Sequence, residues 1–379
     1  MAPVLQDTFR RDFGVAQDAV QQGVTSQRSR TADAHWIQWT QFATELGVDS
    51  VLQTVKDKVP LLQVFAQRIR TGKLSRSRTA IHARSVEDYL RSVGQTFLAL
   101  GTEDPRYTAQ GKMDFRLTRM ISAWKKTDPP PDRVKPVPVR VLRHISIIAT
   151  AGTDPVLHAI SDMIILAFFF LLRPGEYTDS PSDTSPFRMC DVQLFIGEQR
   201  LNITTASIAN IQSTTFASLT FTNQKNGVRG EVIGLSRSGC NQLCPVRAIL
   251  RRILHLRRAR APLTTPLARV SITPTQWAKI TPSLITNTLR RAVHFLGPAL
   301  GFLPTDVSAR CLRAAGANAL LCAKVDGDII RLLGRWRSDE MLRYLHLQAG
   351  PVMQNFSRLM LNGGAFTLIP NQTVPQLPN

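Results

Sequence analysis

Apolar and aromatic side chains recur at helical intervals through the first third of the chain. The stretch 31–46 shows this most clearly, and its large apolar residues are Trp36, Ile37, Trp39, Phe42 and Leu46. Residues three or four apart share one face of a helix, so this stretch predicts an amphipathic helix. Comparable patterns at 52–71, 75–101 and 112–124 predict three more helices in an all-helical domain that spans 28–124.

The two ends of this first domain differ from it in composition. Residues 1–27 are polar and rich in Gln without strong periodicity, which predicts a loose arm. Residues 125–138, KKTDPPPDRVKPVP, contain five prolines and four basic residues. Because proline favours an extended, semi-rigid chain, this stretch is predicted to be a linker. A second domain is expected at 139–361, followed by a tail at 362–379.

The second domain mixes helical and strand patterns. Helices are predicted at 139–150, 155–172, 244–260, 282–296, 314–323 and 328–333. Short runs rich in branched residues predict strands at 192–195, 201–204, 218–222 and 231–235. Residues 261–281 are rich in Pro and Thr and are expected to form a connector. The chain is therefore predicted to be mainly α with a small β-sheet, an α+β fold.

The net charge of the chain indicates what kind of molecule it binds. The chain of 379 residues has a formal charge of +20 and a pI near 10.8. A surplus of this size points to a polyanion such as nucleic acid. An anionic membrane surface is the competing interpretation, but no lipidation signal supports it. The apolar run 163–172 is also shorter than the roughly 20 residues that a membrane span needs.

The predicted helix 244–260 concentrates basic charge on its polar side. Six arginines lie there without an acidic residue in the window, namely Arg247, Arg251, Arg252, Arg257, Arg258 and Arg260. A solvated face is the ordinary explanation of a run of charges. The lack of acids instead predicts contact with phosphate groups, and the first five arginines are the candidates for DNA binding.

The five cysteines are odd in number and scattered, and the N-terminus does not resemble a secretory signal. Both features favour a reducing compartment inside the cell. Cys240 and Cys244 are a weak hint of a metal site, but no second pair of ligands follows them. Structural thiols are the expected use of these cysteines, and no metal or cofactor is expected.

The stretch 306–347 carries the strongest candidate chemistry. Arg310 and Arg313 are three residues apart, so both can lie on one face of a helix. Planar guanidinium groups suit the paired oxygens of a phosphate. A turn containing Gly334, Arg335 and Trp336 follows, and a further helix, expected to begin near residue 338, contains Tyr344.

Two more candidates precede this stretch. Arg173 and Glu176 follow an intensely hydrophobic run that Pro174 and Gly175 should end, which would hold Arg173 rigidly. The bland interpretation is an arginine at a helix end that pairs with Glu176. Lys225 precedes an Asn-Gly turn between two predicted strands, so it should lie at a hairpin tip, where a lysine is usually a solvated edge charge.

The ordered appearance of these residues resembles the tyrosine recombinase (phage integrase) family, in particular members carried by eukaryotic mobile elements. The resemblance implies that Tyr344 is the nucleophile, that Arg173 and Arg313 are the catalytic arginines, and that Lys225 is the general acid. It further implies that Glu176 supports the site. A helical core-binding domain, an integrase-like catalytic domain, a double-stranded DNA substrate and a homo-multimer, a tetramer on DNA, are also implied.

Two positions depart from the family pattern. Arg310 stands where the family has a histidine, and an arginine cannot accept a proton at neutral pH. The family's His/Trp position falls on Arg335 when residues are counted from the glycine or from Tyr344, and on Trp336 when residue type is matched. Either side chain can donate a hydrogen bond to phosphate.

Three functions remain open at this point. The leading one is a site-specific DNA recombinase or integrase that cleaves and rejoins DNA through a phosphotyrosine. A type IB topoisomerase uses the same chemistry on one duplex. A DNA-binding protein derived from a recombinase, without catalysis, is the third. Work on DNA implies an intracellular protein, nuclear if it is eukaryotic.

Overall fold

The computed structural model describes residues 3–74, 78–129, 135–180, 185–222, 230–323, 325–336 and 355–367. The chain divides into two compact units, Met1–Pro131 and Asp132–Asn379. The division falls within the stretch predicted as a linker. Within the described ranges, no helix combines the length and apolar character that crossing a membrane requires.

The first unit is all helical, as predicted. Its helices are α1 (Pro3–Gln22), α2 (Ser26–Glu45), α3 (Val59–Arg70), α4 (Ala83–Ala99) and α5 (Phe115–Thr127). Helices α2 to α5 pack around a core of large aromatic side chains, including Trp39, Phe42, Phe65 and Phe97. The Trp39 ring meets the Phe65 ring edge to face at 5.1 Å, a favourable aromatic geometry.

The prediction of a loose arm at 1–27 was wrong, because most of this stretch is helix α1. Leu5, Phe9 and Phe13 follow one another at four-residue intervals, and the rings of Phe9 and Phe13 stack with centroids 5.9 Å apart. Contacts at this spacing stabilise a helix. The apolar residues of α1 nevertheless stay exposed, so the helix draws little support from a core.

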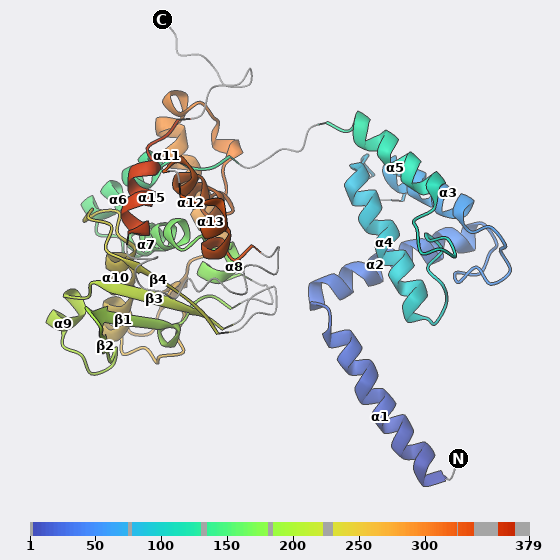
Figure 1. Cartoon of the computed structure of the whole chain (residues 1–379), viewed down its shortest axis with the longest axis horizontal. Coiled ribbons are helices and arrows are strands. Elements are labelled where there is room, and N and C mark those ends of the chain that lie inside the picture. The colour runs from blue at the N-terminus through green and yellow to red at the C-terminus, as the bar shows by residue number, and fades with distance from the viewer. Residues whose placement is uncertain are drawn as a thin grey trace, which may run out of the picture. The chain divides into compact units, whose positions relative to one another are not determined.

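Helix α7 (Pro155–Phe169) is the centre of the second unit (Figure 1). Eleven consecutive residues, from Ala159 to Phe169, are buried. A helix that is apolar on all sides must be covered on all sides. The covering helices are α6 (Val139–Ala151), α10 (Pro245–Arg258), α11 (Pro282–Leu296) and α12 (Cys311–Cys322).

A four-stranded antiparallel sheet lies along one side of this helical body (Figure 1). Its strands are β1 (Val192–Ile196), β2 (Gln199–Leu201), β3 (Phe216–Phe221) and β4 (Glu231–Ser236), in the order β2-β1-β3-β4. The mainly α fold with a small sheet is therefore confirmed. Strands β3 and β4 form the predicted hairpin and pair as far as Phe221 and Glu231.

Several elements were not predicted. The expected connector 261–281 contains the two-stranded sheet of β5 (Arg269–Ser271) and β6 (Trp277–Lys279), and α9 (Ile208–Gln212) is a short helix between β2 and β3. Helix α15 (Phe356–Gly363) extends into the stretch expected to be a tail and packs on α12 and β4. Buried Phe356 and Met360 explain why these residues belong to the domain.

Candidate active site

Arg173 lies at a tight junction between α7 and the short helix α8 (Pro174–Tyr177). Its backbone N–H donates to Oε2 of Glu176 at 2.8 Å, and its Nη1 donates to Oε1 at 3.1 Å. The Glu176 side chain is 3% exposed, whereas that of Arg173 is 25% exposed. A buried carboxylate therefore fixes Arg173 while part of its side chain still reaches solvent.

Arg335 reaches the same carboxylate from the end of α13 (Gly327–Gly334). Its Nη2 donates to Oε2 of Glu176 at 3.0 Å, and the side chain is 2% exposed. The guanidinium also donates to the carbonyl oxygens of Phe170 at 3.1 Å and Leu171 at 3.0 Å. Burial lowers the pKa of Arg335 to about 10, and the negative charge of Glu176 opposes that shift.

Arg313, near the start of α12, brings a third guanidinium to the cluster. Its Nη2 donates to the carbonyl oxygen of Gly334, and its guanidinium carbon lies 4.3 Å from the centre of the Trp336 ring. A side chain at Gly334 would overlap that ring, so glycine is needed there. Nη1 of Arg313 is buried and has no hydrogen-bond partner among the described residues.

The electrostatics of this arginine cluster, defined as Arg173, Arg313, Arg335 and Glu176, favour an anion. Arg173 and Arg335 pair with Glu176, whereas Arg313 does not, so the three guanidinium groups and one carboxylate leave a formal excess of two positive charges. Burial, together with the positive charges of Arg335 and Arg173, lowers the pKa of Arg313 to about 9. Because burying an unpaired charge is costly, an oxyanion beside Arg313 would relieve both the desolvation and the repulsion.

The structure separates the two candidates for the His/Trp position. Arg335 is enclosed and donates from both Nη atoms to protein oxygens, although its buried Nε has no partner among the described residues, whereas Trp336 lies over Arg313 and is 38% exposed. Arg310 is exposed, and its backbone N–H donates to Oγ of Ser308 at 3.3 Å. Trp336 is therefore better placed than Arg335 to meet a ligand at Arg313.

Lys225 and Tyr344 lie outside the described residues. Lys225 belongs to the segment that joins β3 to β4, and Phe221 at the end of β3 has its ring centre 3.8 Å from the guanidinium carbon of Arg335. Tyr344 follows Trp336 by eight residues. The segments that lead to both residues thus start from residues in contact with the cluster.

The predicted DNA-binding arginines of α10 have different environments. The assignment of Arg252 to DNA was wrong, because it is 2% exposed and donates from Nε to the carbonyl oxygen of Leu267 at 2.9 Å and from Nη2 to that of Arg269. A helical pattern places Arg252 on the polar side, but the β5 segment covers it.

The other four arginines of this set remain at least partly accessible. Arg251 pairs with buried Asp162 at 2.5 Å, and Nη1 of Arg257 donates to the carbonyl oxygen of Ala206 at 2.8 Å. Arg258 is exposed, and Arg247 is half-buried. The DNA-binding prediction therefore stays open for these four residues, of which Arg251 and Arg258 are exposed.

Sequence patterns missed the pairing of Arg335 with Glu176. The two residues are 159 positions apart, so no local spacing signals their contact. The described residues contain no group of three His, Cys, Asp or Glu side chains that could hold a metal ion, and the five cysteines are free thiols.

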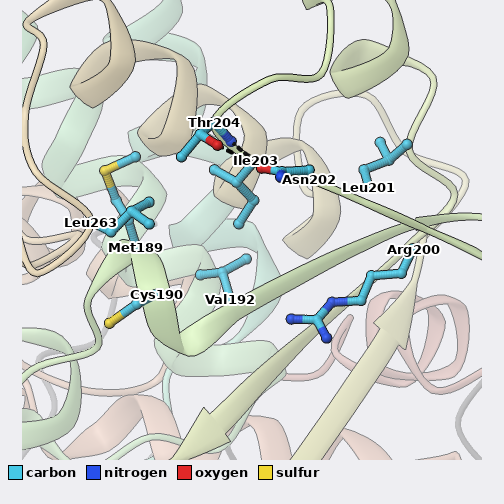
Figure 2. A pocket seen from close by; sticks show the side chains of 9 residues that line it. All are labelled: Met189, Cys190, Val192, Arg200, Leu201, Asn202, Ile203, Thr204 and Leu263. Carbon is cyan, nitrogen blue, oxygen red and sulfur yellow. Dashed lines mark hydrogen bonds between the residues drawn. The ribbon is translucent and has the colours of Figure 1, made fainter.

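A pocket of about 490 Å³ lies elsewhere in this unit, beside β1 and β2 (Figure 2). Its lining shares no residue with the arginine cluster. Asn202 and Thr204 hydrogen-bond to each other at its rim, with Oδ1 of Asn202 accepting at 2.6 Å from the Thr204 hydroxyl. The cluster, not this pocket, is where the candidate chemistry gathers.

The solved structures that are similar to the chain include two integrases. The integrase from mycobacterium phage Brujita is 16% identical, with a TM-score of 0.31, and the match covers 96% of this chain and 94% of that one. The Tn1549 transposon integrase, in complex with circular intermediate DNA, is 13% identical, with a TM-score of 0.42, and the match covers 82% of this chain and 95% of that one. No family model and no curated protein matches the chain.

Proposed function

We propose that the protein is a site-specific DNA recombinase or integrase that cleaves and rejoins strands through a covalent phosphotyrosine at Tyr344. One observation carries the proposal: Arg173 and Arg313, 140 positions apart in the sequence, belong to one positively charged cluster, and Arg313 keeps a buried, unpartnered Nη1. Such a group needs an acceptor, and a phosphodiester provides two charged oxygens.

The chemistry follows from the roles of these residues. Arg173 and Arg313 neutralise the non-bridging oxygens of the scissile phosphate, and the indole of Trp336 adds a donor. The Tyr344 oxygen, which gives up its proton to solvent water, bonds to phosphorus as the bond to the leaving oxygen breaks. Lys225 gives that oxygen a proton, so the cleaved strand ends in a hydroxyl. The phosphotyrosine keeps the energy of the broken bond for rejoining.

The substrate in this proposal is double-stranded DNA. The formal charge of +20 suits the phosphate backbone, and exposed Arg258 is placed for such a contact. Exchange of strands between two duplexes needs several protomers, so a homo-multimer, a tetramer on DNA, is part of the proposal. A DNA substrate also implies an intracellular protein, nuclear if the element is eukaryotic.

Covalent trapping tests the proposal. Wild-type protein and Tyr344→Phe are incubated with a pool of nicked duplexes, denatured and examined for protein-linked DNA. The expected result is an adduct in the wild type that Tyr344→Phe does not form, because phenylalanine lacks the attacking oxygen. An adduct that persists in Tyr344→Phe would contradict the assignment of the nucleophile.

Two further outcomes separate the alternative functions. An adduct, together with relaxation of supercoiled DNA and no joining of two sites, would indicate a type IB topoisomerase. Tight DNA binding by the wild type with no adduct from a randomised pool would indicate a recombinase-derived DNA-binding protein. Salt dependence is expected in every case and does not distinguish them.

A further inference from the structure

Arg335 occupies an unusual backbone position. It ends α13 in the left-handed region, with φ of 57° and ψ of 39°, where glycine is the usual residue. A side chain other than Asn or Asp is disfavoured there unless its contacts compensate. Arg335 has such contacts, since its side chain is almost fully enclosed by protein.

The contacts of Arg335 join the separate segments that carry the proposed active-site residues. Its Nη atoms donate to the carbonyl oxygens of Phe170 and Leu171, at the end of α7, and to Glu176 in α8. Its guanidinium carbon lies 3.8 Å from the centre of the Phe221 ring, at the base of the hairpin that leads to Lys225.

The turn that contains Arg335 also supports Arg313. Nη2 of Arg313 donates to the carbonyl oxygen of Gly334, the residue that precedes Arg335. Leu171, whose carbonyl Arg335 binds, has a left-handed backbone as well, with φ of 51°. One guanidinium therefore ties two disfavoured backbone turns together, and both turns lie next to a catalytic arginine.

We infer that Arg335 is a positioning residue that assembles the phosphate site without touching DNA. This inference rests on the proposed function. Arg335 and Arg173 both pair with the Glu176 carboxylate. The carboxylate therefore orients Arg173, but part of its charge is neutralised by Arg335. When Arg335 is removed, Glu176 is left to Arg173 alone, and their pairing draws the Arg173 guanidinium away from phosphate.

Substitution of Arg335 tests this role by separating binding from catalysis. Arg335→Gly is the most informative variant, because glycine accepts the left-handed backbone and only the side chain is lost. Its single-turnover rate of adduct formation on nicked duplexes is expected to fall about 100-fold, because misplacing the catalytic groups by about 1 Å costs a factor of this size. The DNA concentration that gives the half-maximal rate should change less than about threefold.

Two further variants act as controls. Arg335→Lys keeps the charge but cannot reach all the acceptors, so its rate should lie between those of the wild type and Arg335→Gly. Added guanidinium ion should raise the rate of Arg335→Gly and not that of Arg335→Lys. Arg331→Ala, which removes an arginine of the same helix that pairs with Asp328 at 3.5 Å, should cleave like the wild type.

Other results would overturn the inference. Wild-type cleavage by Arg335→Gly would show that the side chain is dispensable. A loss confined to DNA affinity would identify Arg335 as a phosphate ligand. If wild-type protein forms no adduct, the proposed function fails, and hydrogen exchange still tests the positioning role. Faster exchange of 170–177 in Arg335→Gly, with the remainder of the second unit unchanged, would support it; unchanged exchange there would refute it.

Discussion

Arg252 and Arg313 are both buried in the second unit, but the described protein groups satisfy their donors to different extents. Burial is the main cause that lowers the pKa of Arg252 to about 10 and that of Arg313 to about 9. Arg252 donates to two backbone carbonyls and is near the negative charge of Asp162. Arg313 keeps an unpartnered Nη1 and is near two other guanidinium groups.

Burial of a charged side chain does not by itself mark a binding site. The hydrogen bonds of Arg252 use its donors within the fold, so its charge stabilises the attachment of β5 to α10. Arg313 retains donor capacity and positive charge that the described protein groups do not satisfy. Unsatisfied capacity in a rigid setting is what a ligand-binding arginine requires.

The largest expected effect comes from Arg313→Ala. Adduct formation in the single-turnover assay should fall about 1,000-fold, because a donor to the transition state is lost. The melting temperature should not fall, since the substitution also removes a poorly solvated charge and the repulsion from Arg335 and Arg173. Arg358→Ala, at an exposed position of α15, is the matched control. Cleavage at the wild-type rate by Arg313→Ala would show that Arg313, like Arg252, is not needed for catalysis.

Arg252→Met should show the reverse pattern. It leaves the carbonyl oxygens of Leu267 and Arg269 without this donor, so the free energy of unfolding should fall by about 2–3 kcal/mol. Chemical denaturation measures this change. The folded variant should form adduct at the wild-type rate. Slower cleavage with unchanged stability would restore Arg252 as a functional residue.

A smaller effect concerns His255, which shares α10 with Arg252. Burial, together with the positive charges of Arg252 and Arg258, lowers the pKa of His255 to about 4. Neutral His255 accepts a hydrogen bond at Nε2 from the Ser271 backbone at 3.0 Å. Because the folded-state pKa is depressed, the unfolded chain binds the extra proton first, so stability should decline as pH falls from 6.5 towards 4.

Melting temperatures across that pH range measure the effect. His255→Gln, which can accept the same hydrogen bond without titrating, should lose this part of the decline. An identical pH profile in the variant would show that His255 does not contribute. At neutral pH this variant should form the DNA adduct at the wild-type rate, since His255 lies in α10 and is not part of the arginine cluster.

Local patterns predicted much of the fold. The predicted helix 282–296 coincides with α11, because Thr281 caps the helix and proline occupies its first position. Strands β3 and β4 were predicted within two residues of their ends. The sheet of β5 and β6 was missed, because strands of three residues are too short to show an alternating pattern, and the stretch around them is rich in Pro and Thr.

The residue types available for phosphate chemistry, and their order along the chain, could be read from the sequence. Arg173, Glu176 and Arg313 could be chosen this way because short motifs mark them. Only the tertiary structure shows which of these charged groups pair with each other and which keep a donor without a partner. Arg252 is buried through a hydrogen bond to Leu267, 15 positions away, and Arg335 pairs with Glu176, 159 positions away. Such contacts depend on how helices and strands pack, so helical or strand periodicity does not predict them.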